Sequence, residues 1–484
     1  MSIRVTKQHV STASAWRQSV ELVLCLVLTV CIFRTWCAES YVVPTASMAE
    51  TVVGLHRDVV CDDCGQPFSC GSDELVDNHN VYMPGSLRAV CPNCGYYEND
   101  LTARPDINGD RLLVHKSAFL FDAPKRWEVA VFRSPEIARK VYIKRIVGLP
   151  GESVQIRDGD VYLDGRLARK SIAEQRAVAI PVHDSRYQPT RHSQLPSRWQ
   201  GEEETSWSAS KQGFSCTGDQ SADKVQSAAS SAQENVDWLV YHHCRRVPGN
   251  SQLVEDVPVT DDSGYNQTRP RLVENVSTVR DLMVHGRVRA SREGRLAFYA
   301  TDGRDVFVAQ LDLATGRAEL QHNGQLVATA EASSQLPLDG AQVELSLFDR
   351  QVTFSIDDQL VFPQYPFEPS NLPRQPTTRP FAIGSIGAAV EVADLAVLRD
   401  IYYTRPPDGR WAIDHSYTLG PDEYFVLGDN SYLSEDSRMW FDSPAVPAEM
   451  LVGRPLFVHL PSRLIDAGNL TLQVPDFSKM RAIR

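Results

Sequence analysis

The spacing of apolar residues along the chain differs from region to region. The first region, near the N-terminus, has an apolar run that predicts a membrane anchor. Between Trp16 and Trp36 the chain has an apolar heart at 22–33, which is flanked by polar and charged residues. A helix over 16–38 is long enough to cross a bilayer, which needs about 20 residues. Basic residues precede the heart and acidic residues follow it, so the positive-inside rule places the N-terminus in the cytoplasm. A cleaved secretory signal and a buried core helix are the alternatives.

Beyond this segment, short runs with a period of two predict a mainly β protein. The run 141–148 is typical of a strand that enters a Pro-Gly turn, and 153–165 of a hairpin with Asp-Gly turns. From 236 to 403, alternating strands and turn signals favour an all-β sandwich, with its clearest hairpin around 349–351. Residues 182–235 are polar and rich in Ser, Gln and Glu, which indicates a linker or a long loop. Trp199, Trp207 and Trp238 indicate that parts of this region dock onto the rest of the protein.

Three polar segments carry candidate chemistry within this β pattern. Ser47 follows an extended run and a proline, shortly after the apolar segment. Lys144 lies on a strand, and burial there would lower its pKa enough for a neutral amine to accept a proton from a serine hydroxyl. The segment 428–438 is a turn rich in Gly, Asp, Asn and Ser, in which Asp436 and Arg438 can pair. Taken singly, each segment also has a non-catalytic interpretation. Ser47 could be an ordinary turn serine, Lys144 a surface lysine whose amine reaches solvent, and 428–438 a structural or calcium-binding loop.

Together, these segments resemble the bacterial signal peptidase I family. The family's lysine box, Lys-Arg-x-x-x-x-Pro-Gly-Glu, is matched in full by 144–152. Its box Gly-Asp-Asn-Ser-x-x-Ser-x-Asp-Ser-Arg is matched in full by 428–438. Residues 44–51, Pro-Thr-Ala-Ser-Met-Ala-Glu-Thr, are similar to its serine box, and 126–132 to its remaining box. Four boxes in the family's order, behind an apolar segment, make the resemblance specific.

The resemblance implies a membrane-bound serine endopeptidase that removes signal peptides from exported preproteins by cutting after small residues. It implies an all-β catalytic domain on the outer side of the bacterial inner (cytoplasmic) membrane and no cofactor for catalysis. Ser47 would be the nucleophile and Lys144 the general base. The supporting residues are Thr45 with the Ser47 amide in the oxyanion hole, Ser434 orienting the lysine, Asp436 and Arg438 as a brace, and Met48 near the substrate and the bilayer edge.

Three departures from the family pattern leave the substrate range open. Glu50 replaces a proline, Thr45 replaces a serine, and Trp127-Glu128 replaces Gly-Asp. Two other functions remain as alternatives. The first is a membrane-tethered binding protein on a retired protease scaffold, and the second is a different Ser/Lys protease, such as a self-cleaving regulator.

Two Cys-x-x-Cys-Gly knuckles predict a metal site in a segment that the family pattern does not require. Four thiolates at this spacing are typical of a closed structural Zn²⁺ site, so we expect a zinc ribbon at 61–104. Two disulfides are the alternative, because the segment lies on the oxidising side of the membrane. Cys70 is spare under either hypothesis, and Cys216 and Cys244 are candidates for a further disulfide. The four knuckle cysteines are Cys61, Cys64, Cys91 and Cys94.

Charge and length complete the expected organisation. The net charge of -12 disfavours nucleic acid as a partner, because phosphate binding requires a basic face. A chain of 484 residues needs two or three domains. The sandwich resembles concanavalin-like jelly rolls, which often bind sugars, although docking onto the protease or a protein ligand explains it equally well. The expected segments are a cytoplasmic N-terminus (1–15), the anchor (16–38), the catalytic domain (39–60, 105–181 and 404–484), the ribbon (61–104), the linker (182–235) and the sandwich (236–403).

Overall fold

The computed structural model of the chain describes residues 12–32, 37–72, 88–137, 139–202, 205–210, 212–218, 236–247, 250–266, 276–331, 336, 339–459, 462–467 and 470–483. Within these ranges the protein is mainly β, as the sequence predicts. Parts of the predicted anchor and of the predicted linker lie outside the described residues.

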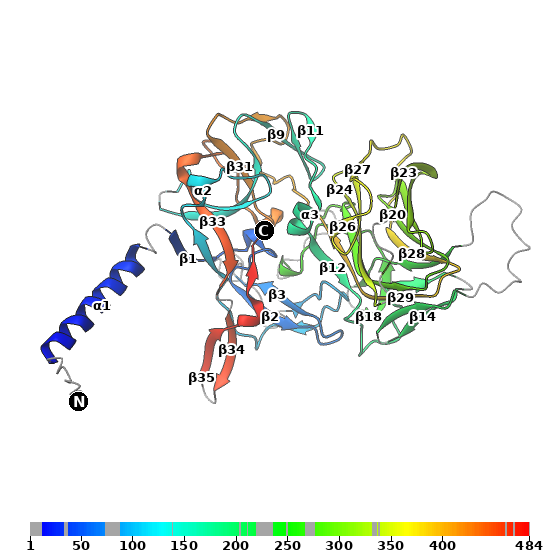
Figure 1. Cartoon of the computed structure of the whole chain (residues 1–484), viewed down its shortest axis with the longest axis horizontal. Coiled ribbons are helices and arrows are strands. Elements are labelled where there is room, and N and C mark those ends of the chain that lie inside the picture. Colours follow the sequence, from blue (N-terminus) through cyan, green and yellow to red (C-terminus); the bar gives the residue numbers. More distant parts are fainter. Residues whose placement is uncertain are drawn as a thin grey trace, which may run out of the picture.

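The apolar N-terminal segment forms helix α1 (Thr12–Ile32), which projects away from the rest of the molecule (Figure 1). Arg17 and Glu21 form an ion pair one turn apart on it. Among the described residues, no helix is both long and apolar enough to cross a membrane. The predicted helix is therefore confirmed, whereas its prediction as a transmembrane span is not.

An eight-stranded sheet carries the two strands that matter for the candidate site. β7 and β8 pair antiparallel with Ala130 opposite Lys144, and β8 pairs with β31 so that Leu427 lies opposite Arg145. The loop that begins at Gly428 therefore leaves the sheet beside Lys144. The strands, in sheet order, are β1 (Ala38–Val42), β6 (Arg111–His115), β33 (Leu451–Val458), β7 (Val129–Arg133), β8 (Val141–Gly148), β31 (Glu423–Leu427) and β32 (Ala445–Pro447), with β36 (Arg481–Ala482) on β33.

A four-stranded sheet extends this part of the protein and confirms the predicted hairpin at 153–165. Asp158 and Gly159 both have positive φ (51° and 91°), which is the geometry of a tight hairpin turn. Helix α3 (Ile172–Val178) follows, and Ser171 and Glu174 close a capping box at its start. The strands are β11 (Arg166–Leu167), β10 (Asp160–Leu163), β9 (Ser153–Arg157) and β30 (Tyr417–Thr418). Helix α2 (Ala118–Phe121) covers β33.

The predicted sandwich consists of two large antiparallel sheets that enclose the largest hydrophobic cluster of the described chain. Phe298 of one sheet packs against Phe354 of the other with ring centroids 5.1 Å apart. The first sheet contains β14 (Trp207–Ser210), β15 (Gly213–Cys216), β29 (Val390–Arg399), β19 (Leu282–Ala290), β24 (Ala341–Phe348), β25 (Gln351–Ile356) and β26 (Gln359–Leu360), with β12 (Ile180–Asp184) and β27 (Tyr365–Pro366) at its side. The second contains β13 (Trp199–Gly201), β16 (Asp237–Tyr241), β28 (Phe381–Ile386), β20 (Arg295–Thr301), β21 (Val306–Asp312), β22 (Arg317–His322) and β23 (Gln325–Glu331).

The sandwich begins earlier than the sequence predicts. Strands β13, β14 and β15 fall inside 182–235, which the polar composition assigned to a linker. Trp199, Trp207 and Phe214 bury their side chains in the sandwich core and carry these strands with them. A few large apolar side chains outweigh a polar average, because each contributes about 1.5–3 kcal/mol when buried.

The cysteine-rich segment forms two small hairpins below the eight-stranded sheet (Figure 1). They are β2 (His56–Val60) with β3 (Pro67–Gly71), and β4 (Arg88–Ala89) with β5 (Asn99–Asp100). This unit joins the sandwich segment through a fully buried ion pair between Asp63 and Arg246. Two further hairpins are β17 (Cys244–Val247) with β18 (Asn250–Asp256), and β34 (Ser462–Ala467) with β35 (Leu470–Pro475).

Candidate active site and cysteine cluster

The candidate nucleophile lies on a short 3-10 helix, η2 (Ala46–Met48), directly after β1. Met48 anchors this turn because its side chain is fully buried in a cluster with Val43 and Val52. The sequence led us to expect Met48 at the bilayer edge, and this was wrong, because the side chain points into the core. Ser47 itself is 7% exposed.

Ser47 and Lys144 meet directly. Lys144 Nζ donates a hydrogen bond to Ser47 Oγ at 2.5 Å. The lysine is 1% exposed on β8. Burial lowers its pKa to about 8, against the opposing charge of Asp436. Roughly a tenth of the amine is therefore neutral at pH 7, and this neutral form can act as a general base.

Asp436 organises the loop after β31. Its carboxylate accepts hydrogen bonds from the Gly428 amide at 3.0 Å and from Ser434 Oγ at 2.6 Å. Arg438 donates to both of its oxygens, from Nε at 2.9 Å and from Nη2 at 2.8 Å. Burial pushes the pKa of Asp436 upward, but Arg438 and these hydrogen bonds outweigh it and the net pKa is lowered. The predicted pairing of Asp436 with Arg438 is thus present as a buried, bidentate contact.

Ser434 lies beside the dyad with its hydroxyl proton committed to Asp436. A hydroxyl that donates in one direction can only accept in others, so towards Lys144 it can act as an acceptor. Its assigned role in orienting the lysine stays a prediction. A Cβ on Gly428 would come within 2.1 Å of Ser434 Oγ and 2.5 Å of the Ser47 carbonyl oxygen. The position therefore requires glycine for steric reasons.

A second buried ion pair, which sequence reasoning did not select, links the same segments. Arg145 donates to Asp429 from Nε at 2.8 Å and from Nη2 at 2.6 Å, and both side chains are almost completely buried. Thr51 Oγ1 also donates to this carboxylate, at 2.5 Å. Arg145 directly follows Lys144 and Asp429 directly follows Gly428, so the two matched boxes contained the signal.

The elements of an oxyanion hole are close to the serine. Ser47 lies in the first turn of η2, where backbone amides have no acceptor within the helix. Thr45 precedes this helix in an extended conformation, and its side chain is exposed. Gly54 packs against the Thr45 carbonyl, where a Cβ would approach the oxygen to 2.4 Å. The role of the Thr45 hydroxyl as an oxyanion donor stays a prediction.

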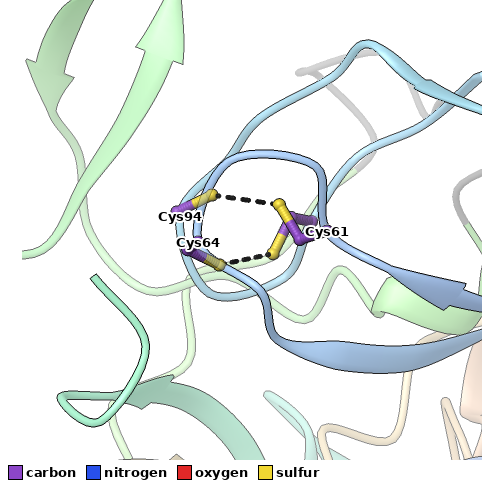
Figure 2. A group of neighbouring side chains, drawn as sticks. Cys61, Cys64 and Cys94 are labelled. Atoms are coloured by element: carbon purple, nitrogen blue, oxygen red, sulfur yellow. Dashed lines mark hydrogen bonds between the residues drawn. The ribbon is translucent and has the colours of Figure 1, made fainter. Parts of the chain in front are cut away.

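The four knuckle cysteines converge on one point. Their sulfur atoms all lie within 4.8 Å of one another, with 3.6 Å between Cys61 and Cys94 and 3.7 Å between Cys64 and Cys91 (Figure 2). A disulfide requires about 2.05 Å between sulfurs, whereas thiolates at about 2.3 Å around a tetrahedral Zn²⁺ lie about 3.8 Å apart. The donor set therefore fits a zinc ion and does not fit two disulfides.

The remaining cysteines stay apart from this cluster. Cys70 is buried in a neighbouring apolar cluster with Val59 and Leu101. Cys216 Sγ lies 3.0 Å from Ser206 Oγ, and both Cys216 and Cys244 are free thiols. The disulfide that we considered between them is therefore absent from the described residues.

Comparisons with solved structures match the chain to carbohydrate-binding proteins, but only distantly. The carbohydrate recognition domain of Emp46p is 11% identical, covering 46% of this chain and 96% of that chain at a TM-score of 0.26. The carbohydrate binding module CBM66 from Bacillus subtilis is 8% identical, covering 42% and 95% at a TM-score of 0.24. These scores are too low to assign the sandwich a fold family or a ligand.

Sequence comparisons match the protease segments. Residues 98–223 and 404–460 match the family described as signal peptidase, peptidase S26. A probable signal peptidase I-1 from Synechocystis is 37% identical over 82 residues, or 15% of this chain and 42% of the relative. Signal peptidase I V from Bacillus subtilis is 38% identical over 76 residues, or 16% and 44%. The signal peptidase I of Rickettsia bellii is 28% identical over 154 residues, or 32% and 40%.

The chain thus spans about two-fifths of the length of these relatives. The matched segments contain Lys144, Ser434 and Asp436, and Ser47 precedes them. Residues 98–223 and 404–460 are therefore similar to the signal peptidase S26 family, and the observed dyad geometry agrees with this similarity.

Proposed function

We propose that this protein is a serine endopeptidase of the signal peptidase I type, with Ser47 as nucleophile and Lys144 as general base. The observation that carries the proposal is the 2.5 Å contact between Lys144 Nζ and Ser47 Oγ, made by a lysine that burial keeps partly neutral. A retired protease scaffold has no need for a desolvated lysine against a serine, since burying an amine costs stability. This geometry favours the enzyme over the binding-protein alternative.

The chemistry follows from the dyad. Neutral Lys144 accepts the proton of Ser47 as Oγ attacks the scissile carbonyl carbon, and the resulting ammonium then protonates the leaving amine nitrogen. A water molecule gives a proton to Lys144 and attacks the acyl-serine ester; as the ester bond to Ser47 Oγ breaks, the Lys144 ammonium returns this proton to Oγ, which releases the second product and regenerates Ser47 and the neutral lysine. Asp436 and Arg438 hold the loop that carries Ser434. The backbone amide of Ser47 and the Thr45 hydroxyl stabilise the negative charge on the tetrahedral oxygen.

We propose preprotein signal peptides, cut after small residues, as the substrates. The similarity of residues 98–223 and 404–460 to the signal peptidase family supports this substrate class. A membrane surface is the corresponding partner, and α1 offers it exposed apolar side chains such as Leu22, Leu26 and Leu28. On the bacterial inner membrane, an extracytoplasmic catalytic domain would meet its substrates as they emerge.

We also propose that the four-cysteine cluster holds a structural Zn²⁺. The sulfur spacing supports this ion, and Gly65 and Gly95 supply the positive φ (77° and 72°) that each knuckle turn needs. A closed site with four thiolates leaves no position for a substrate, so the metal would stabilise the fold rather than take part in catalysis.

The proposed activity is tested with the full-length chain, purified in detergent and offered a preprotein that has alanine at the cleavage site. We expect the wild type to cut at one position, and Ser47→Ala and Lys144→Ala each to reduce the rate by at least about 1,000-fold. Lys125→Ala, which removes an exposed lysine away from the site, is the control and should retain full activity. Undiminished cleavage by Ser47→Ala would exclude the dyad mechanism.

A further inference from the structure

A segment of the large insert reaches under the serine turn. Residues 263–266, here called the clamp, end in the short 3-10 helix η5 (Gly264–Asn266). Tyr265 is buried against Ala46 and Ala49 on either side of the nucleophile, and its hydroxyl donates to the Leu55 carbonyl at 2.8 Å. Ser263 Oγ donates to Glu50 Oε1 at 2.9 Å. The clamp thus contacts both ends of the segment that carries Ser47.

The last residue of the clamp forms a reciprocal amide pair with the loop after β31. Asn266 Nδ2 donates to Asn430 Oδ1 at 2.8 Å, and Asn430 Nδ2 donates to Asn266 Oδ1 at 2.7 Å. Both side chains are buried, with 4% and 5% exposed. Two hydrogen bonds between buried side chains fix the plane of each amide relative to the other.

Asn430 in turn holds the nucleophile turn from two points. Its side-chain Nδ2 donates to the Ala46 carbonyl at 3.1 Å, and its backbone amide donates to the Ser47 carbonyl at 3.1 Å. A carbonyl accepts and cannot donate, so Ala46 dictates which end of the Asn430 amide carries nitrogen. That choice then dictates the orientation of Asn266. Only one combination of amide orientations therefore satisfies all of the hydrogen bonds between Ala46, Asn430 and Asn266.

We propose that Asn266 is a positioning residue for Ser47. It rests on the proposed function above and extends it, because it makes a residue of the insert part of the machinery that aligns the dyad. Asn266 does not touch the reacting atoms. Its side chain fixes the orientation of the Asn430 amide. Asn430 in turn holds the carbonyls of Ala46 and Ser47, and their position sets the direction of Ser47 Oγ towards Lys144. The insert is then required for catalytic geometry and is not merely attached to the protease.

The first test compares cleavage kinetics of Asn266→Ala with those of the wild type. We expect kcat to fall about 10- to 100-fold with little change in KM, because small misplacement of a reacting group costs rate rather than binding. Gln175→Ala is the matched control. This fully buried amide also ties the protease part to the sandwich, through Ser346 and Thr353, away from Ser47. An unchanged kcat in Asn266→Ala, or an equal loss in both variants, would overturn the proposal.

A second variant separates positioning from folding. In Asn266→Asp an ionised carboxylate oxygen faces Asn430 Oδ1, another acceptor, whereas a protonated carboxyl can donate to it and restore the pair. The ratio of its kcat to that of the wild type should therefore rise as the pH falls. A ratio that does not vary with pH would count against the amide pair.

A third readout does not depend on cleavage. Hydrogen exchange of a peptide containing residues 46–49 should be faster in Asn266→Ala than in the wild type or in Gln175→Ala. Equal exchange in all three proteins would contradict the proposed positioning. A wild type that exchanges slowly but fails to cleave would contradict the proposed function alone.

Discussion

At the scale of single residues, the buried basic side chains of the site differ in whether a carboxylate compensates their charge. Lys144 has no carboxylate bonded to it among the described contacts, whereas Arg145 and Arg438 each have a bidentate one. Burial therefore lowers the pKa of Lys144, whereas the bidentate contacts of the two arginines with carboxylates give those side chains a structural role. Lys144 and Arg145 are adjacent on β8 and point to opposite faces of the sheet. The first can therefore act in catalysis while the second supports the structure.

The pKa of Lys144 predicts the pH dependence of the reaction. Only the neutral amine can accept the serine proton, and its fraction increases as the pH rises through about 8. We expect kcat/KM to rise about tenfold per pH unit well below that value and to level off above it. Steady-state kinetics between pH 5 and pH 10 would check this, with Lys144→Arg as a control that should show no activity at any pH. A rising limb centred above pH 10 would mean that the lysine is not desolvated.

At the scale of elements, tight turns place functional groups where strands end. The loop after β31 returns to the sheet within a few residues because Gly428 admits Ser434 and the Ser47 carbonyl at close range. The two cysteine knuckles need glycine for its positive φ instead, and Gly65 and Gly95 donate their amides back to the carbonyls of Cys61 and Cys91 at 2.9 Å. Each knuckle thereby presents two sulfurs on one side.

These knuckles predict one bound zinc ion per chain. Elemental analysis of the purified protein should find close to one Zn²⁺, and Cys64→Ala should lose it because three thiolates leave the tetrahedral site open. Cys70→Ala is the matched control, since it removes a buried cysteine outside the cluster and should keep the metal. An equal metal content in the two variants, or none in the wild type, would contradict the zinc assignment.

At the scale of the whole molecule, the parts are joined by a shared hydrophobic cluster, in which Met283 and Phe348 of the sandwich pack with Phe425 of the catalytic sheet, and by buried polar contacts. Asp63 and Arg246 connect the cysteine unit to the sandwich segment. Lys170, just before α3, pairs with Asp349 and Asp400 at 2.8 and 2.7 Å in the same way. Such pairs tolerate only one docking arrangement, because a buried charge without its partner is strongly destabilising. The catalytic segments and the insert are thus held in a defined relation.

Helix α1 predicts how the molecule associates with membranes. Its exposed leucines have no counterpart elsewhere on the described surface that is equally dense and stands clear of the body (Figure 1). We expect the full-length chain to float with lipid vesicles, and Leu24→Glu combined with Leu28→Glu to abolish flotation, because charge opposes burial in lipid. Leu360→Glu, at an exposed leucine of the sandwich, should float like the wild type. A wild type that remains with the soluble fraction would contradict the prediction.

The local order of residues was enough to predict much of this protein. The 141–148 strand, the Asp-Gly hairpin, the sandwich hairpin at β24 and β25, and the knuckle turns all arise from contacts a few residues apart. Ser47 and Lys144 could be selected as candidate site residues because the motifs that contain them, 44–51 and 144–152, are short and contiguous. The prediction of a linker or long loop at 182–235 was wrong for part of this segment. Three aromatic side chains there are buried against partners that lie far along the chain.

By itself, then, the sequence was enough to predict most of the elements, the family resemblance, and Ser47, Lys144 and the four cysteines as candidate site residues. The tertiary structure alone decided the rest. It brought Lys144 to Ser47 across 97 residues, buried Met48 instead of exposing it, and placed Asn266 of the insert against Asn430. Local patterns fix φ, ψ and the face of each side chain, but burial, pKa and hydrogen-bond partners depend on which distant surfaces meet.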